Sequence, residues 1–243
     1  MLSAPKAGSS ESEYEDAWWV PRGAPSAVEG CTVAVADGAS ESLLAGAWAN
    51  MLVRGIGALS GADMDDALFA QRICETAARW PGYLGRYVRR REKAGRPIAW
   101  YEEPKLEQGA YATVLGVSLR RASGPVYSGG GVWTAAALGD SCAFQVRGER
   151  LVAAFPLASP EDFDTSPDLA GTRNPDRDLI ERRTLTRRGT WLPGDVFYLA
   201  TDAASQWFLA QDAVDGRPWR QIDAAFDDQT AWLDELRARR LIR

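Results

Sequence analysis

The sequence predicts a single α+β domain with antiparallel strands. Apolar residues recur at helical spacing before residue 95 and again after residue 203, whereas short β-branched runs and Gly-rich turns fill residues 110 to 155. No repeat or linker divides the 243 residues, a length typical of one large domain or two small ones. We therefore expect one domain over residues 14–243, preceded by a flexible arm at residues 1–13 that is rich in Ser, Ala, Gly and Glu.

The first half of the chain combines two extended segments with three helices. Residues 14–20 suit a short Trp-bearing strand, and CTVAVA at 31–36 reads as a buried strand that stops at the turn Asp37-Gly38. A helix follows at about 41–59, with Ser40 or Ser42 able to cap its start. Further helices are expected at about 65–79 and 83–94, separated by Trp80-Pro81-Gly82.

The second half is expected to be mainly extended until its last forty residues. A loop holding Pro97 and Pro104 precedes this part. The segment from 156 to 178 lacks periodicity and reads as a long loop, either a functional flap or a mobile segment. Strands are expected at 110–119, 132–138, 142–146, 151–155, 183–187 and 196–201, and helices in two or three pieces over 203–240.

Composition excludes several function classes. The balance of 28 basic and 33 acidic residues gives a net charge of −5, so charge provides no reason to bind nucleic acid or anionic membranes. The chain has no histidine, which excludes Ser-His-Asp and Cys-His catalysis and imidazole zinc ligands. Any chemistry must use carboxylates, hydroxyls, cations or a bound metal.

The expected compartment is the cytoplasm. The three cysteines are far apart and lie in apolar sequence, which fits free thiols in a reducing environment. The N-terminus has no apolar signal-peptide core, and no apolar run approaches the ~20 residues that span a bilayer.

Three aspartates follow apolar, strand-like segments. Asp37 follows CTVAVA, Asp140 follows WTAAALG and Asp202 follows VFYLAT. Taken singly, each can be a turn or cap residue. If these strand ends meet at one edge, with Glu15-Asp16 as a fourth acidic element, a cation would stabilise the carboxylates, and oxygen ligands favour Mg²⁺ or Mn²⁺.

Five short motifs resemble, in order, those of the metal-dependent type 2C protein phosphatase (PPM) family of the bacterial type. The resemblance extends over nearly the whole chain. It implies an α-β-β-α arrangement with a central antiparallel β-sandwich flanked by helices. The motifs are Glu15-Asp16-Ala17-Trp18, Val35 to Ser42 (VADGASES), Ala110 to Thr113 (AYAT), Ala137 to Ser141 (ALGDS), and Gly194-Asp195 leading into Leu199 to Ala203 (LATDA).

The resemblance also implies a function and a metal site. The implied reaction is hydrolysis of phosphoserine or phosphothreonine in a protein by a metal-activated water, with no protein nucleophile, and the implied setting is signalling opposite a Ser/Thr kinase. It implies two Mg²⁺ or Mn²⁺ ions and a third, weaker site. The implied roles are a bridging ligand for Asp37, an assisting carbonyl for Gly38, a further ligand for Asp202, a place near the metals for Glu15 and Asp16, and the third site for Asp140.

Three departures from the family pattern keep a second hypothesis open, that of a weakly active or inactive phosphatase-like binding or regulatory domain. No basic residue precedes the acidic pair between Glu11 and Tyr14, and Ala39 follows Asp37-Gly38, so water would have to protonate the leaving group. The chain stops at Arg243 without the family's closing acidic pair and last strand, so we expect a domain truncated before that strand. Asp227-Asp228 resembles the pair, but the helical spacing of the apolar residues after it argues against that role.

A basic run lies on the helix expected at 83–94. This run is either a solvated helix face or a docking site for an acidic or phosphorylated partner. Its members are Arg86, Arg89, Arg90, Arg91, Lys93 and Arg96.

Overall fold

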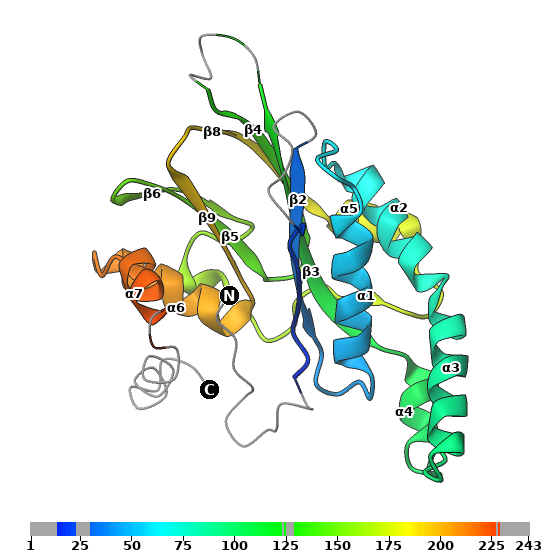
Figure 1. Ribbon diagram of the computed structural model, residues 1–243. Coiled ribbons are helices and arrows are strands. Elements are labelled where there is room, and N and C mark those ends of the chain that lie inside the picture. Colours follow the sequence, from blue (N-terminus) through cyan, green and yellow to red (C-terminus); the bar gives the residue numbers. More distant parts are fainter. Residues whose placement is uncertain (1–13, 23–29, 123, 125–128, 227, 229–243) are drawn as a thin grey trace.

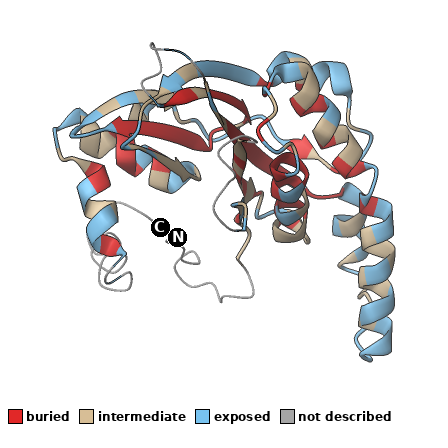
Figure 2. Ribbon diagram, turned by 45° about the horizontal axis from the view of Figure 1, so that its top comes forward, coloured by how far each residue is buried: buried red, intermediate tan, exposed pale blue. Residues whose placement is uncertain are grey.

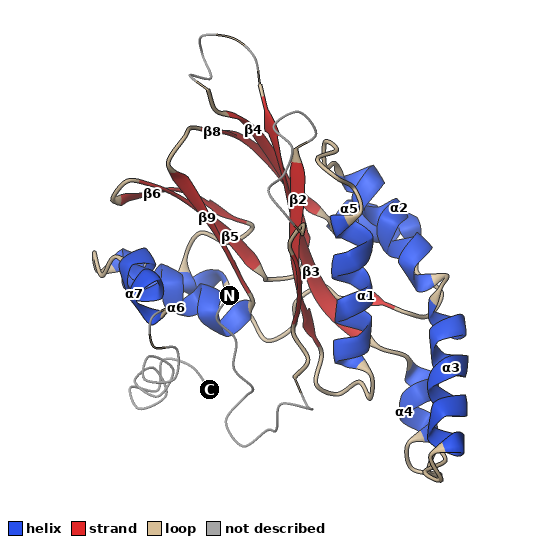
Figure 3. Ribbon diagram, in the orientation of Figure 1, coloured by secondary structure: helices blue, strands red, loops and turns tan. Residues whose placement is uncertain are grey.

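In the computed structural model, two antiparallel sheets stack on one another and helices cover both outer faces (Figures 1 and 3). The structure describes residues 14–22, 30–122, 124, 129–226 and 228. The arm expected at 1–13, Asp227 and the helical segment expected after 228 lie outside these residues. The layers follow the order helix, sheet, sheet, helix, which confirms the predicted α+β class.

The larger sheet has the strand order β1-β2-β3-β4-β8, and the two-residue strand β7 pairs with the start of β3. Every pairing in this sheet is antiparallel. The bounds are Ala17–Trp19 for β1, Cys31–Gly38 for β2, Tyr111–Arg121 for β3, Gly131–Leu138 for β4, Ala170–Gly171 for β7 and Leu185–Trp191 for β8.

The smaller sheet has three antiparallel strands in the order β6-β5-β9. Its middle strand is buried along most of its length, whereas β9 is half-buried or exposed. The bounds are Cys142–Arg147 for β5, Arg150–Phe155 for β6 and Asp195–Ala200 for β9.

Helices α1, α2 and α5 lie on the outer side of the larger sheet, and α6 and α7 lie on the outer side of the smaller one (Figure 1). Helices α3 and α4 extend away from the body. The bounds are Ala45–Gly57 for α1, Asp66–Ala77 for α2, Trp80–Lys93 for α3, Glu103–Gln108 for α4, Arg177–Arg183 for α5, Asp202–Ala213 for α6 and Pro218–Ala225 for α7, and a 3₁₀ turn spans Pro160–Asp162.

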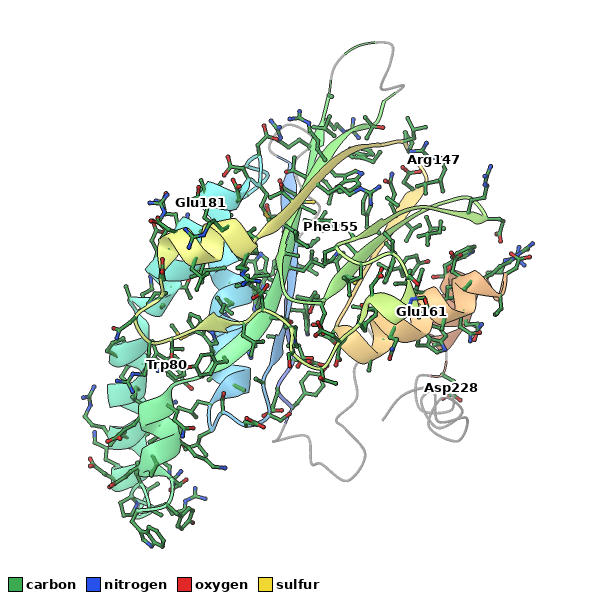
Figure 4. The ribbon with its side chains drawn as sticks, turned by 180° about the vertical axis from the view of Figure 1, so that it is seen from behind. Trp80, Arg147, Phe155, Glu161, Glu181 and Asp228 are labelled. Atoms are coloured by element: carbon green, nitrogen blue, oxygen red, sulfur yellow. The ribbon has the colours of Figure 1, made fainter. Side chains whose placement is uncertain are left out.

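The core has three parts, one at each junction between layers (Figure 2). Trp48 of α1 is fully buried against the larger sheet. Phe155, seen near the centre of Figure 4, lies in the part between the two sheets. On the far side, the rings of Phe144 and Phe208 stack at 4.1 Å between β5 and α6. Burial of these apolar faces on both sides of each sheet is the main favourable contribution to folding.

Proline accounts for two differences from the predicted elements. Helix α3 begins at Trp80 and takes Pro81 into its first turn, and Pro104 lies in the first turn of α4, where only a loop was expected. Proline fits the first turn because the N–H groups there have no intrahelical partner.

Other elements also differ in extent from the sequence-based expectation, among them β8, which covers Leu185–Trp191 instead of 183–187. Residues 177–183 form α5 rather than loop and strand, and Asp176 caps it by accepting a hydrogen bond from the Leu179 N–H at 3.0 Å. Strand β2 continues through Asp37 and Gly38 instead of stopping before them. Helix α1 begins at Ala45 without a side-chain cap from a serine.

In the described part of the chain, no helix has both the length and the apolar character needed to cross a lipid bilayer.

Candidate metal centre at the rim of the sheets

Strand register brings Asp16 and Asp37 together. Ala17 of β1 lies opposite Ala36 of β2, so the next residue outward, Asp16, comes opposite Asp37. Directly opposed residues of an antiparallel pair share one face of the sheet. Ala17 and Ala36 face the core under α1, whereas Val35, two residues before Asp37, packs between the sheets. The side chains of Asp16 and Asp37 therefore face the smaller sheet.

Asp140 and Asp202 lie near one another at the end of the smaller sheet. Cys142 of β5 is paired with Ala200 of β9, and the two aspartates lie two residues beyond this last pair, close enough for the charge of Asp202 to raise the pKa of Asp140. Asp202 is exposed in the first turn of α6, and its Oδ1 accepts a hydrogen bond from the Ala203 N–H at 2.6 Å. A second pair of carboxylates therefore lies at the sheet end from which α6 starts.

Asp140 is the buried member of this second pair. Its side chain is 9% exposed, and Oδ1 has no hydrogen-bond partner among the described residues. Burial, reinforced by the negative charges of Asp202 and Asp164, raises the pKa of Asp140 to about 6. A buried carboxylate oxygen without a donor is costly, so a cation or a proton at this position would stabilise it.

Two hydroxyl contacts join the larger sheet to the smaller one at this rim. Thr201, at the end of β9, donates from Oγ1 to Oδ2 of Asp16 at 3.5 Å. The hydroxyls of Thr113 and Ser141 lie 2.9 Å apart, and Thr113 is the register partner of Asp37. Both carboxylate pairs consequently lie at the same end of the sandwich, where β2 ends and α6 begins.

Gly38 allows the acidic N-terminal segment to approach the rim. A Cβ atom at this position would lie 2.8 Å from Ala45 and 2.9 Å from the backbone oxygen of Glu15, so a side chain does not fit. Ser40 donates from Oγ to Oε2 of Glu15 at 2.5 Å instead of capping α1. These contacts hold Glu15 and Asp16 beside the end of β2.

The donor set fits a hard divalent cation in type, because the rim offers oxygen ligands without imidazole. The unpartnered Oδ1 of Asp140 is the observation that best fits such an ion. Across the residues that the structure describes, however, no three acidic or cysteine side chains are arranged to hold one ion together. The aspartates of the rim thus form two pairs, one at each sheet, rather than one cluster of ligands.

The hydroxyls of Thr113, Ser141 and Thr201 have structural roles that the sequence did not assign to them. All three lie within the motifs that carry the family resemblance. Alternation along β3 offered a signal for Thr113, because it shares a face with Leu115 and Val117, which pack between the sheets. The contacts of Ser141 and Thr201 depend on how the two sheets stack, and the alternation of apolar and polar residues along a strand does not reveal this.

No family model matches the chain, and no curated protein matches its sequence. Similar solved structures include the catalytic domain of the serine/threonine protein phosphatase PstP in complex with two manganese ions, at 14% identity over 82% of this chain and 75% of that one, with a TM-score of 0.48. The Mycobacterium tuberculosis phosphatase PstP/Ppp matches at 14% identity over 85% and 76%, with a TM-score of 0.47. The photosystem II phosphatase PBCP matches at 15% identity over 84% and 68%, with a TM-score of 0.43. All three of these solved structures are phosphatases.

Proposed function

We propose that this chain is a metal-dependent phosphatase that hydrolyses phosphoserine or phosphothreonine in proteins. The observation that supports the proposal is the nearness of four aspartates at one end of the sandwich. Asp16 and Asp37 follow directly on the pair Ala17 and Ala36, Asp202 is close enough to Asp140 to raise its pKa, and Thr201 contacts Asp16. These four carboxylates and Gly38 are the proposed metal site. We further propose cytoplasmic phosphoproteins, phosphorylated by a Ser/Thr kinase, as its substrates.

When bound, two divalent cations would lower the pKa of a water molecule so that it can act as the nucleophile. They would also neutralise the charge of the phosphoryl oxygens. The residues of the chain hold the ligands in place for this chemistry. Thr201 holds Asp16 through its hydroxyl, and strand pairing holds Asp37 beside it. Asp202 is exposed and accepts a short-range hydrogen bond from the Ala203 N–H at Oδ1, so its other oxygen can turn toward an ion.

Two features of the rim bear on proton transfer. The chain has no histidine, and Ala39 follows Gly38, so no side chain next to Asp37 can protonate a leaving serine or threonine. Solvent would provide that proton. Asp140, whose pKa lies at about 6, loses its own proton near neutral pH and is then available as a ligand.

A second function has one observation in its favour. Because no three carboxylates of the described residues converge, the rim also suits a phosphatase-like domain that binds a phosphoprotein or regulatory partner without turnover. The two functions differ in whether cations support hydrolysis.

Hydrolysis of p-nitrophenyl phosphate by the purified chain tests the proposal. Activity is expected with Mn²⁺ and is expected to vanish with a chelator. Asp37→Asn should lower the rate by about a hundredfold or more without unfolding the protein, because its charge serves the metal rather than the core. Asp215→Asn, a change of the same kind at an exposed turn far along the chain, is the control and should keep full activity.

Two results would count against the proposed hydrolysis. Equal hydrolysis with and without chelator would exclude metal-dependent catalysis. A folded protein that binds Mn²⁺ but gives no hydrolysis with p-nitrophenyl phosphate or a phosphothreonine peptide would support the binding domain instead.

A further inference from the structure

Helices α3 and α4 form an arm that stands out from the two-sheet body, toward the lower right in Figure 1. Trp80 anchors the arm: it is buried, packs edge-on against Trp48 of α1 at 5.9 Å and lies where α3 leaves the body in Figure 4. Farther out, Arg91 of α3 binds both carboxylate oxygens of Glu102 at the start of α4, at 3.1 and 3.0 Å. The arm is therefore a fixed structural unit.

One side of α3 carries a basic groove. Five of the fourteen residues of α3 are Arg or Lys and one is Glu, although the whole chain has a net charge of −5. The groove has a volume of about 440 Å³, and its cationic side chains are exposed. Among the described residues, none of these cations forms an ion pair with a carboxylate, in contrast to Arg91. The residues that line the groove are Tyr83, Arg86, Arg89, Arg90 and Lys93.

Two glycines lie along the side of α3 on which these cations fold back. A Cβ atom on Gly82 would meet only Nη1 of Arg86, at 3.5 Å, and one on Gly85 only Nη1 of Arg89, at 3.4 Å. Each glycine inside a helix costs about 1 kcal/mol relative to alanine. No other helix or strand approaches these positions, so close packing does not account for the glycines. Because the two glycines have no side chains, only backbone lies beneath the guanidinium groups of Arg86 and Arg89.

We infer that this groove, defined by Tyr83, Arg86, Arg89, Arg90 and Lys93, docks an extended Asp/Glu-rich segment of a protein partner. Unpaired guanidinium groups bind carboxylates in a fixed, two-pronged geometry. From Tyr83 to Lys93 the helix rises about 15 Å, which matches about five residues of extended chain. Tyr83 stacks on Trp80 with ring centroids 5.2 Å apart, so it offers a fixed aromatic surface at one end.

A protein segment suits the groove better than a nucleic acid. The groove is short and local, and the remainder of the chain is acidic, so a long polyanion would meet repulsion beyond the arm. A short acidic peptide reaches only the cations. Docking does not depend on the proposed phosphatase activity.

The position of the arm links the groove to the rim. Helix α4 ends at Gln108, and β3 begins three residues later at Tyr111, whose backbone oxygen accepts a hydrogen bond from the Ala39 N–H at 2.9 Å. Ala39 follows the proposed ligands Asp37 and Gly38. If the proposed function is correct, the arm that holds the partner is thereby connected through the backbone to the rim with the metal site.

Fluorescence anisotropy with a fluorescein-labelled pentaglutamate peptide tests the inference on the full chain, with chelator present so that the result is independent of the metal site. Saturable binding is expected that weakens as salt is raised. The double variant Arg86→Glu/Arg90→Glu should weaken it by about tenfold or more, since two exposed ion pairs are replaced by repulsion.

The control is Arg182→Glu/Arg188→Glu, which changes net charge equally at exposed positions on α5 and β8 and should bind as the unchanged protein does. Equal weakening by both double variants would overturn the inference, because it would show a response to net charge alone. So would the absence of binding, or binding of a pentaglutamine peptide with equal strength. Tighter binding of labelled oligothymidylate than of pentaglutamate would assign the groove to nucleic acid and overturn it as well.

Discussion

At the scale of single residues, the charge of Asp195 is stabilised by more hydrogen bonds than that of any other carboxylate described above. Its side chain is 1% exposed. Arg147, on β5 and labelled in Figure 4, donates from Nε at 2.7 Å and from Nη2 at 2.8 Å. Gln145 donates at 2.7 Å and the Leu192 N–H at 2.9 Å. In the sequence, Asp195 stands out only as part of the Gly194-Asp195 motif ahead of an expected strand.

These donors connect the two sheets. Gln145 of β5 accepts from the Trp133 indole N–H at 2.9 Å and donates to the Thr190 carbonyl at 2.9 Å, and both partners belong to the larger sheet. Arg147, above all, lowers the pKa of Asp195, with the Leu192 N–H and Gln145 contributing in the same direction. Its ionised form is therefore part of the folded structure.

Replacing Asp195 by Asn should reduce the free energy of unfolding by about 2 kcal/mol near neutral pH, because charged hydrogen bonds are lost. A depressed folded-state pKa stabilises the protein above the unfolded-state value and ceases to do so as pH falls through the folded-state value. The difference between variant and parent should therefore shrink below about pH 4. Urea unfolding of the variant and the parent protein, near neutral pH and below about pH 4, measures this difference.

Asp215→Asn serves as the control, since the Asp215 side chain is 88% exposed, and it should change stability little at either pH. A loss for Asp195→Asn that is the same in acid as at neutral pH would assign the effect to the amide group rather than to the lost charge.

At the scale of elements, the same residue type has opposite consequences in two helices. In α1, a Cβ atom on Gly57 would lie 1.9 Å from the Trp19 ring of β1, and one on Gly55 would lie 2.5 Å from Oγ1 of Thr76 in α2. These glycines allow α1 to contact its neighbours closely. In α3, Gly85 has no such neighbour.

Alanine substitution separates the two cases. Gly57→Ala should lower the free energy of unfolding by about 2 kcal/mol, as expected for overpacking. Gly85→Ala should leave stability unchanged or raise it by about 0.5 to 1 kcal/mol, because alanine favours the helix. Thermal or urea unfolding of the two variants measures both, and a destabilised Gly85→Ala protein would contradict the open surface described for α3.

At the scale of the whole molecule, the candidate site combines residues from two separate sheets. Residues 16 and 37 lie at the end of the larger sheet, and residues 140 and 202 lie at the adjoining end of the smaller sheet. The core between the sheets and the contact of Thr201 with Asp16 set their relative position. A cation bound between them would favour the folded state only.

Mn²⁺ should therefore raise the thermal midpoint of unfolding. An excess of about a hundredfold over the dissociation constant contributes about 2.7 kcal/mol, which corresponds to a rise of about 5 °C or more in a protein of this size. Asp16→Asn/Asp202→Asn should abolish the rise, whereas Asp63→Asn/Asp215→Asn should retain it. Differential scanning calorimetry decides this without an activity assay, and an unchanged midpoint with Mn²⁺ would count against a metal site at the rim.

The α+β class, the main strands and the helical periodicity of α1 and α2 could be predicted from the sequence alone, because the spacing of apolar residues reports local burial. The sequence also identified the three aspartates that follow strands and the acidic pair Glu15-Asp16. It could not reveal α4 or α5, since short helices lack enough turns for a periodic signal and Pro104 suggested a loop.

How these residues meet depends on the tertiary structure. Asp16 comes beside Asp37 through the pairing of β1 with β2, and Asp202 comes near Asp140 through the pairing of β5 with β9, whose strands are about sixty residues apart in the chain. The burial of Asp140, the network around Asp195 and the free groove on α3 arise from stacked sheets and from a helix that leaves the body. These are non-local contacts, and no local pattern of residue types encodes which surfaces will face one another.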